Sequence, residues 1–582
     1  MASDADSNPK GSGRAMGLIV LGSLSALGYT ALLWLSWQFA DNTLDNVVKP
    51  TLAMLAIFGS LFIAYWCALW LALRLPSSRW LLGGIFAAAC LFRGILLPSI
   101  PMHEIDIYRY IWDGAVLADG VSPYRYSPEQ VQEAVNNGGS NDATLQHLVE
   151  LQSRSESLNN SLFQIHYGQY PSPYPIVSQA VFALSAQLTP DTASLQTRLV
   201  TMKGLLVLFD LATLAVVMLL LHSVGMHPGW SLAYGWCPLM MKEIANGGHL
   251  DSIALFFTTL AILLLIRAWQ TTSLREVRVA LTGLVLALAI GAKLYPVVLL
   301  PLFAAVWLRR HGWLSAALGV ATTSLIAAVL LYPLFGPKHS LPTTQLAQQA
   351  ASPPNADGLL NAPLSLPQPS VDADEGIRAF FNQWEMNDLV FMVVLENLRQ
   401  QEELAPEYRP WFVLTSDEWS LAVVTRWAVL IGIDAPLTPS QLKAASFSLA
   451  RVLTGGVFAL VACLLAWFAA GKADPQAWCR AAMLTLAWFW LTCPTQNPWY
   501  WCWVLPLLPF ARYRTWHIVA AVTMLYYLRF WFIAHYPDPP VFGAPYSGAY
   551  FFYFVIAWVE FLPLLLALSV ECFFEWREND KR

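Results

Sequence analysis

The sequence predicts an all-α protein that crosses a membrane many times, and three observations lead to this prediction. Of its 582 residues, 57% are apolar and only 12% are charged, whereas about 25% are charged in an ordinary soluble domain. Tryptophan and tyrosine are abundant, with 26 and 21 residues, as is typical of chains that cross bilayer interfaces repeatedly. Long apolar runs recur, many of them near the ~20 residues that span a hydrocarbon core as a helix.

Apolar runs at 17–37, 51–73 and 80–98 predict the first three membrane spans. Basic residues precede the first run and separate the second from the third. The positive-inside rule places such basic turns on the cytoplasmic side. Residues 1–16 are then a cytoplasmic tail, and the segment 99–171 is a large loop outside.

The remaining runs predict one polytopic domain over 17–571, with roughly 12–13 spans and a cytoplasmic tail at 572–582. Run 279–308 is too long for one span and is broken at Gly291 to Pro296, so we expect a helical hairpin with its tip outside. Between 172 and 267 the number of apolar runs is inconsistent by one with the sides that the basic residues predict for the loops. One run there must fail to span the membrane, and the sequence does not identify which. The further runs lie near 174–189, 199–221, 230–245, 251–267, 279–308, 313–335, 446–470, 479–493, 498–511, 515–534 and 549–571.

The two outside segments differ in character. The second, 336–444, begins with a stretch rich in Pro, Gln, Ala and Ser, which is typical of a flexible loop. Within it, Phe380 to Arg399 predicts an amphipathic helix on the membrane surface. In the first segment, Glu129 to Gln169 predicts a loop with short surface helices.

Charge and cysteine content exclude several classes of function. The net charge is −5 and no basic patch occurs, so a nucleic-acid partner is not expected. The eight cysteines lie mostly in apolar runs without metal-ligand spacing, which disfavours a zinc site or a disulfide framework. No cofactor is expected.

A cluster of acids, a base and aromatic residues follows the third apolar run directly. Glu104, Asp106, Arg109 and Asp113 lie at the mouth of a membrane span, where charged side chains are rare unless they are functional. The alternative is an interfacial helix whose aromatic residues anchor in headgroups while its charges face water.

This cluster predicts a short helix from Asp106 to Leu117, ended by Gly120 to Pro123. Helical spacing places Asp106, Tyr110 and Asp113 roughly on one face of it. The stretch therefore presents two carboxylates on the side that carries Tyr110.

Four more polar clusters interrupt apolar runs. Singly, His249 or Asp251 could cap a helix, and Lys293 could extend to the interface. Together they predict half-length helices around a membrane-embedded cavity, since irregular backbone at that depth must be covered by protein or water. A cavity with such charges suits a lipid-linked substrate with a phosphate. The clusters are Lys242-Glu243 with Gly248-His249-Leu250-Asp251, Lys293-Leu-Tyr-Pro296, Gln496-Asn497-Pro-Trp499-Tyr500 and Tyr174-Pro-Ile-Val-Ser-Gln179.

These motifs occur in an order that resembles a known family. Asp106-Ile-Tyr-Arg-Tyr-Ile-Trp-Asp-Gly114 with Ser-Pro-Tyr124, Gly-His-Leu-Asp251, Lys-Leu-Tyr-Pro296 and Gln-Asn-Pro-Trp-Tyr500 resemble the bacterial mannosyltransferase-like branch of the GT-C superfamily, over about residues 80–570. Members are multi-pass enzymes that use a polyprenyl-phosphate sugar at the outer face of the membrane. The resemblance implies that Asp106 is the catalytic base.

Three departures from the family pattern leave sugar and acceptor open. The family often has Tyr-Pro-Pro where this chain has Tyr174-Pro175-Ile176, and His where it has Asn497. Many relatives carry adjacent acids, whereas Ile105 separates Glu104 from Asp106 here.

The chemistry of inverting sugar transfer matches these residue types. It needs a carboxylate that takes the acceptor's proton and cations that hold the departing phosphate. Asp106 is the expected base, with Glu104 as the second acid, and no metal is required because the donor is already a phosphate ester. Arg109, Lys293 and His249 are candidates for the phosphate, Arg being suited to bidentate contact. The other candidate substrate-binding residues are Tyr110, Asp113, Tyr124, Tyr174, Gln179, Asp251, Asn497, Trp499 and Tyr500.

The predicted function is transfer of a sugar, expected to be mannose, from a polyprenyl-phosphate donor to a lipid-linked or cell-envelope glycan in the plasma (inner) membrane. A lipid flippase or transporter is the alternative, because it would also show broken helices and buried charge, although no inverted repeat is found. A scaffold protein would leave the intramembrane charges unexplained.

Overall fold

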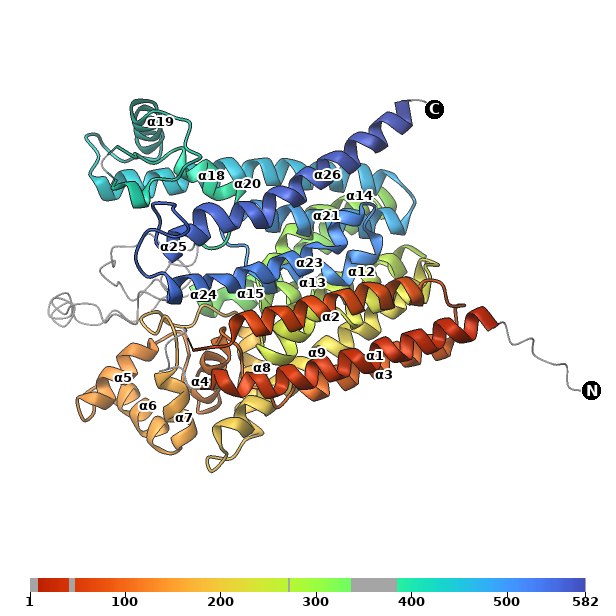
Figure 1. Ribbon diagram of the computed structural model, residues 1–582, viewed down its shortest axis with the longest axis horizontal. Coiled ribbons are helices and arrows are strands. Elements are labelled where there is room, and N and C mark those ends of the chain that lie inside the picture. Colours follow the sequence, from red (N-terminus) through yellow and green to blue (C-terminus); the bar gives the residue numbers. More distant parts are fainter. Residues whose placement is uncertain (1–8, 41–47, 271–272, 336–384, 403, 581–582) are drawn as a thin grey trace, which may run out of the picture.

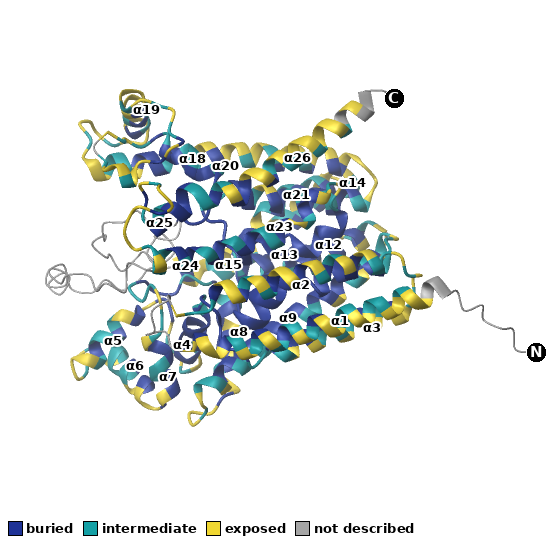
Figure 2. Ribbon diagram, viewed as in Figure 1, coloured by how far each residue is buried: buried dark blue, intermediate teal, exposed yellow. Residues whose placement is uncertain are grey.

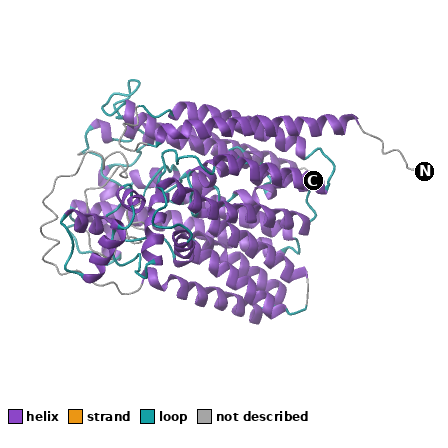
Figure 3. Cartoon of the chain, turned by 90° about the horizontal axis from the view of Figure 1, so that it is seen from below, coloured by secondary structure: helices purple, strands orange, loops and turns teal. Residues whose placement is uncertain are grey.

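The structure is a computed structural model that describes residues 9–40, 48–270, 273–335, 385–402 and 404–580. Within these ranges the regular structure is helical, and the only β-pairing is in isolated bridges (Figure 3). The prediction of an all-α chain is confirmed.

Eight helices in the described ranges are long and apolar enough to cross a membrane, judged by length and composition. They run roughly alongside one another in one bundle (Figure 1). The predicted number, roughly 12–13, is higher because it counted apolar runs that fold into shorter helices. The long helices are α1 (Pro9–Ser36) with η1 (Trp37–Phe39), α2 (Thr51–Ala72), α3 (Arg79–Leu96), α9 (Leu195–Ser223), α12 (Asp251–Gln270), α15 (Trp313–Phe335), α20 (Pro439–Gly471) and α25 (Gly548–Phe551), which continues through η10 (Phe552–Ile556) into α26 (Ala557–Asp580).

The surface of the bundle is apolar along its length. Val329 on α15, Leu460 on α20 and Leu566 on α26 are 72%, 62% and 57% exposed, and exposed positions recur along these outer helices (Figure 2). Contiguous exposed apolar surface of this extent is expected where lipid is the solvent. The chain is therefore a multi-pass membrane protein.

Several apolar runs fold into short helices placed end to end, with proline at many of the junctions. Proline removes a backbone donor and disfavours a continuous helix. Run 230–245 is one of these, and the long run 279–308 is broken after Ala292, as predicted. These helices are η2 (Pro228–Ser231), α10 (Leu232–Gly235), α11 (Pro238–Met240), the π-helix η3 (Met241–Asn246), α13 (Arg275–Ala292), η4 (Tyr295–Leu299), α14 (Leu300–His311), α21 (Pro475–Thr492), α22 (Pro498–Trp501), η7 (Leu505–Phe510), η8 (Arg514–His517), α23 (Val519–Val522), η9 (Thr523–Tyr527) and α24 (Leu528–His535).

The first outside segment folds into four short helices at one end of the bundle (Figure 1). The predicted helix at Asp106 is present and ends next to Gly120, whose φ is +84°; glycine adopts this conformation without strain. The expected surface helices between 129 and 169 are also present. The four are α4 (Asp106–Ala118), α5 (Pro128–Asn136), α6 (Ala143–Ser153) and α7 (Glu156–Phe163).

The run that fails to span is 174–189, which forms α8 (Ile176–Gln187). Before α8, the Ser172 amide donates to the Pro123 carbonyl over 3.1 Å. After it, the Ala193 carbonyl accepts from Ser157 over 2.8 Å. Both ends of α8 therefore lie beside the short helices of the first outside segment, so the chain enters and leaves this helix from one side.

The beginning of α1 and the end of α26 lie at the opposite end of the bundle from α4 to α7 (Figure 1). Helix α1 begins at Pro9 and α26 continues to Asp580. The expected tails at 1–16 and 572–582 are thus partly helical, because a helix can continue past the apolar run that identifies it.

In the second outside segment, the predicted helix at Phe380–Arg399 is wrong over its described part. Only Val390–Glu396 is helical there, as α18, and residues 380–384 lie outside the described residues. Phe391 and Leu395 are fully buried against α19 (Asp417–Leu430) and α20. Their apolar faces meet protein rather than a membrane surface.

A buried ion pair ties the interrupted passage before α12 to its neighbours. Arg93 on α3 contacts Asp210 on α9 over 2.6 Å and donates to the Gly235 carbonyl over 2.8 Å. The Tyr234 hydroxyl donates to the same aspartate over 2.6 Å. Fully satisfied buried charges of this kind fix the arrangement of the elements that carry them, here α3, α9 and α10.

Candidate functional site

Helix α4 is held tightly against α8, which fixes the position of its acidic first turn. A Cβ on Gly114 would lie 2.3 Å from the Phe182 carbonyl oxygen, so only glycine fits there. One helical turn earlier, the Tyr110 ring stacks on Phe182 with centroids 4.6 Å apart. The carboxylate of Asp106, at the first position of α4, is therefore carried on a rigid support.

Arg109 and Asp113 pair with each other inside the contact between α4 and α8. Their side chains meet at 2.9 Å, and Arg109 also donates to the Tyr170 carbonyl over 2.9 Å. Gln179 on α8 donates to Asp113 over 3.3 Å and to Ser172 over 2.7 Å. These contacts occupy the guanidinium that the sequence suggested for phosphate.

Tyr110, Tyr124 and Tyr174 gather beside this pair. Tyr110 and Tyr174 meet edge to face at 5.1 Å, and the Tyr124 hydroxyl donates to the Tyr174 carbonyl over 2.8 Å. The three rings form one side of the candidate site.

The two acids at the head of α4 have different surroundings. Glu104 accepts a 2.8 Å hydrogen bond from Tyr526. Burial raises the pKa of Glu104 and the charge of Asp106 adds to this rise, whereas His249 opposes it. Asp106 is partly exposed, and no hydrogen bond from the described residues engages its carboxylate. Asp106 is the acid with an available carboxylate.

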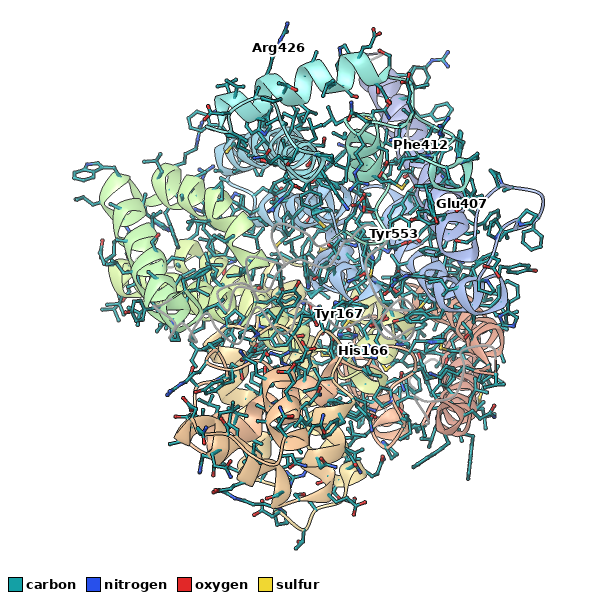
Figure 4. All side chains as sticks on the ribbon, turned by 90° about the vertical axis from the view of Figure 1, so that its left-hand side faces the viewer. His166, Tyr167, Glu407, Phe412, Arg426 and Tyr553 are labelled. Carbon is teal, nitrogen blue, oxygen red and sulfur yellow. The ribbon has the colours of Figure 1, made fainter. Side chains whose placement is uncertain are left out.

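His166 and Tyr167 lie near the middle of the end of the bundle that carries α4 to α7 (Figure 4). Burial lowers the pKa of His166, and the negative charge of Asp106 partly offsets this. The loop between α7 and α8 thus brings His166 toward the same acid.

Beneath the acids, the π-helix η3 carries a lysine and a glutamate that are fully buried. Glu243 accepts a 2.7 Å hydrogen bond from Tyr527 and lies 3.3 Å from His249. The Lys242 ammonium is 4.0 Å from Glu243 and 4.4 Å from the Tyr527 ring centre, and it has no hydrogen-bond partner among the described residues. A π-helix is rare and frequently marks a functional site.

A second buried pair lies beside the first. Lys293, just after α13, contacts Asp251 over 2.7 Å, and the Trp503 indole donates to the same carboxylate over 2.6 Å. The Lys293 ammonium also sits 4.6 Å from the Tyr500 ring centre. The charge of Lys293 is thus already balanced.

Trp499 connects the two pairs. Its ring stacks on His249 with centroids 4.3 Å apart and meets Tyr526 edge to face at 6.0 Å. His249 Nε2 has the 3.3 Å contact with Glu243, whereas His249 Nδ1 and Asn497 Oδ1 make no hydrogen bond among the described residues. Buried polar groups without partners are uncommon in native proteins and need an explanation such as a ligand or water.

The structure brings all the predicted site residues to one end of the bundle, from the head of α4, from α8, from the start of α12, from the turn after α13 and from α22. It also adds residues that were not among the predicted site residues. Lys242 and Glu243 belong to a polar cluster that the sequence singled out, whereas Tyr526, Tyr527 and Trp503 lie in aromatic-rich runs that gave no distinguishing signal.

No family model, characterised protein or solved structure matches this chain. Within the described ranges, no three His, Cys, Asp or Glu side chains gather as ligands of one metal ion.

Proposed function

We propose that this protein is a GT-C-type glycosyltransferase that uses a polyprenyl-phosphate sugar, expected to be mannose, at the outer face of the plasma membrane. One observation carries the proposal: an available carboxylate, Asp106, lies at the same end of the bundle as two buried basic side chains, Lys242 and His249, whose closest charged neighbour is Glu243. Transfer from a phosphate ester requires both an acid that accepts a proton and basic groups that hold the phosphate.

In the transfer step, Asp106 takes the proton of the acceptor hydroxyl. The acceptor oxygen forms a bond to the anomeric carbon as the bond from that carbon to the phosphate oxygen breaks. The electron pair leaves with the polyprenyl phosphate, and the sugar configuration inverts because the acceptor attacks from the opposite face. Glu104, held by Tyr526, is the second acid and orients the sugar.

Lys242 and His249 stabilise the charge that develops on the departing phosphate. Lys242 joins this group because its ammonium makes no hydrogen bond in the described structure, whereas Arg109 and Lys293 are engaged by Asp113 and Asp251. We assign Arg109 the role of holding α4 on α8, and Lys293 that of orienting the Tyr500 ring. A cation in a water-excluded site stabilises developing charge more than it would in water.

The rings of Trp499 and Tyr500 contact the sugar, while Tyr110, Tyr124 and Tyr174 line the approach of the acceptor. Aromatic side chains combine an apolar face with a polar edge where a substrate bridges lipid and water. The acceptor class is a lipid-linked or cell-envelope glycan.

Radiolabelled transfer tests the proposal. Purified protein in vesicles receives polyprenyl-phosphate-[³H]mannose and an extract of envelope glycolipids. The expected result is label on the glycolipid and release of unlabelled polyprenyl phosphate, with Asp106→Asn as the inactive control. If the intact donor instead moves between leaflets without transfer, in wild type and variant alike, the protein is a flippase and the proposal fails.

A further inference from the structure

Helix α19 lies across the direction of the bundle rather than along it. In Figure 1 it is seen nearly end-on, above the left-hand part of α20, and in Figure 4 it runs across the top of the view. It packs on α20 through Ser420, Val424 and Ala428, which are buried. It is thus a short helix roughly perpendicular to the spans, at the predicted outer side.

The outward surface of this helix and its flanks is apolar. Leu414 is 93% exposed, Leu430 is 80% exposed, and Trp419 and Val429 are about half exposed. Arg426 points away from the molecule on the same helix (Figure 4). Exposed apolar side chains with few charges on a helix in this orientation are typical of an element that lies in the membrane interface.

Behind α19 lies a groove of about 680 Å³, hereafter the α19 groove, a volume within the ~300–1,000 Å³ typical of small-molecule sites. Its lining comes from α18, α20, α26 and the loop before α19. The lining is dominated by apolar side chains, namely Val393, Leu398, Trp411, Phe412, Trp419 and Trp558.

The Asn397 and Thr415 side chains in the lining are already hydrogen-bonded, whereas the buried Trp558 indole nitrogen has no hydrogen-bond partner among the described residues. Asn397 donates to the Val393 carbonyl over 2.9 Å and accepts from the Leu414 amide over 2.8 Å. The Thr415 hydroxyl donates to the Asn397 carbonyl over 2.7 Å. No charged residue is among the lining residues. The groove therefore suits a hydrocarbon chain, because its lining carries no charge that would bind a phosphate.

The α19 groove is continuous with the lipid-facing surface. Leu453 on α20 and Trp558 on α26 belong to the lining. One turn farther along α20, Val457 is 60% exposed, and beside Trp558 on α26, Val559 is 55% exposed. A chain in the groove would thus run directly into the bilayer along these two helices.

We propose that the α19 groove holds one acyl chain of an outer-leaflet phospholipid, with α19 lying in the interface as its roof. The surrounding bilayer supplies this lipid at high local concentration, and the lining makes no demand on its headgroup. The site is separate from the sugar-transfer site, so occupancy of the groove and sugar transfer are tested separately; the two proposals share only the predicted orientation of the bundle.

Photocrosslinking of the full-length protein in vesicles tests this proposal. The vesicles contain phosphatidylcholine with a diazirine in one acyl chain, and adducts are mapped by mass spectrometry. We expect adducts on Trp411, Phe412 and Trp419, and the same yield when phosphatidylglycerol carries the probe. Leu453→Trp fills part of the groove and should lower these yields severalfold, while Leu460→Trp, two turns farther along the same face of α20 and outside the groove lining, should leave them unchanged.

Other outcomes overturn the proposal. If adducts form on exposed residues of α20 and α26 but not on 411–419, the groove is not occupied by lipid. Crosslinks between residues 411–419 of two copies would instead make this surface a contact between protein chains. If both tryptophan variants lower the yield equally, the labelling reports bulk lipid and not a site. Misfolding of Leu453→Trp is detected by comparing melting temperatures, and Val394→Trp then fills the groove from α18.

Discussion

Glu104 and Asp106 stand two residues apart at the head of α4, yet only Glu104 is held by a hydrogen bond, from Tyr526. We predict that Asp106→Asn lowers turnover by about 10²–10⁴-fold, the usual contribution of general acid–base catalysis, while donor binding is kept. Glu104→Gln should lower turnover less. Single-turnover transfer rates and donor binding, measured for both variants, check this.

A reversal of these two effects would make Glu104 the base. If both variants keep near-normal turnover, the acids of this loop are structural, and the base must be sought at Asp251 or Asp388.

Lys242 offers a sharper test of phosphate binding than Lys293. Lys242→Met keeps the length of the side chain and removes the charge, so it should cost about 1.5–3 kcal/mol of donor binding, or roughly 10–100-fold in Kd. Lys293→Ala should weaken donor binding less and lower stability more, because it leaves Asp251 buried without its cation. Titration with donor and with acceptor measures both; an equal loss for the two substrates would contradict the phosphate role.

Asp388, in the second outside segment, gives a prediction about pH. Burial raises the pKa of Asp388 well above its ordinary value, with the charge of Glu385 adding to the rise. Because the folded state holds this proton more tightly than the unfolded state, stability falls as pH rises from the ordinary aspartate pKa to the raised one. Asp388→Asn keeps an oxygen for the Met392 amide and removes the charge.

At neutral and alkaline pH the free energy of unfolding of the variant should therefore exceed that of wild type by about 1–3 kcal/mol, and the variant should melt at a higher temperature. The difference should vanish in acid. Thermal unfolding in detergent across pH measures it. Asp434→Asn, at an exposed position, is the control and should show no such trend. A constant difference at all pH values would mean that the buried carboxyl does not titrate.

At the scale of elements, the contact between α4 and α8 carries a prediction of its own. Gly114→Ala would place a methyl 2.3 Å from the Phe182 carbonyl oxygen, so α4 must move away from α8 and carry Asp106 with it. Because small displacements of a reacting group are costly, turnover should fall by about 10-fold or more although no reacting group is changed. Gly120→Ala, which meets no atom within 4 Å but lies at positive φ, is a control for backbone strain. Transfer rates of the two variants check this, and an unchanged rate in Gly114→Ala contradicts it.

Apolar length predicted the long helices well because each must bury its own backbone hydrogen bonds in lipid. It failed at 230–245, where Pro238 interrupts the run and short helices are stabilised by Arg93 and Tyr234 from within the bundle. It failed again at 174–189, because nothing local distinguishes a helix buried in protein from one buried in lipid.

For the whole molecule, the placement of basic residues predicts that the end carrying α4 to α7 faces outward. Ser153→Cys on α6 should then react with a membrane-impermeant maleimide on intact cells, and Ser273→Cys, between α12 and α13 at the opposite end, should react only after the cells are opened. The background is a variant without the native cysteines, all of which are unbridged thiols. The opposite pattern would invert the molecule and move the candidate site to the cytoplasm.

The sequence identified those residues of the candidate site that place a charged side chain within an apolar run. Asp106, His249, Asp251 and Lys293 are of this kind, and the fold brings them together. Their pairings could not be predicted, because the contact of Arg109 with Asp113 depends on how α8 packs on α4. The Tyr526 bond to Glu104 joins segments 422 residues apart, beyond the reach of any local pattern.

Helix α8 has a consequence for the order in which the protein is built. Its Ser178 hydroxyl donates to the Ala292 carbonyl over 2.8 Å, and Gly291 meets Val177, so α8 rests on the end of α13. During synthesis α8 emerges more than a hundred residues before that partner. We therefore expect α4 and α8 to remain at the membrane surface without their final packing until α13 has been inserted. The head of α4 should then be among the last parts of the protein to reach its final position.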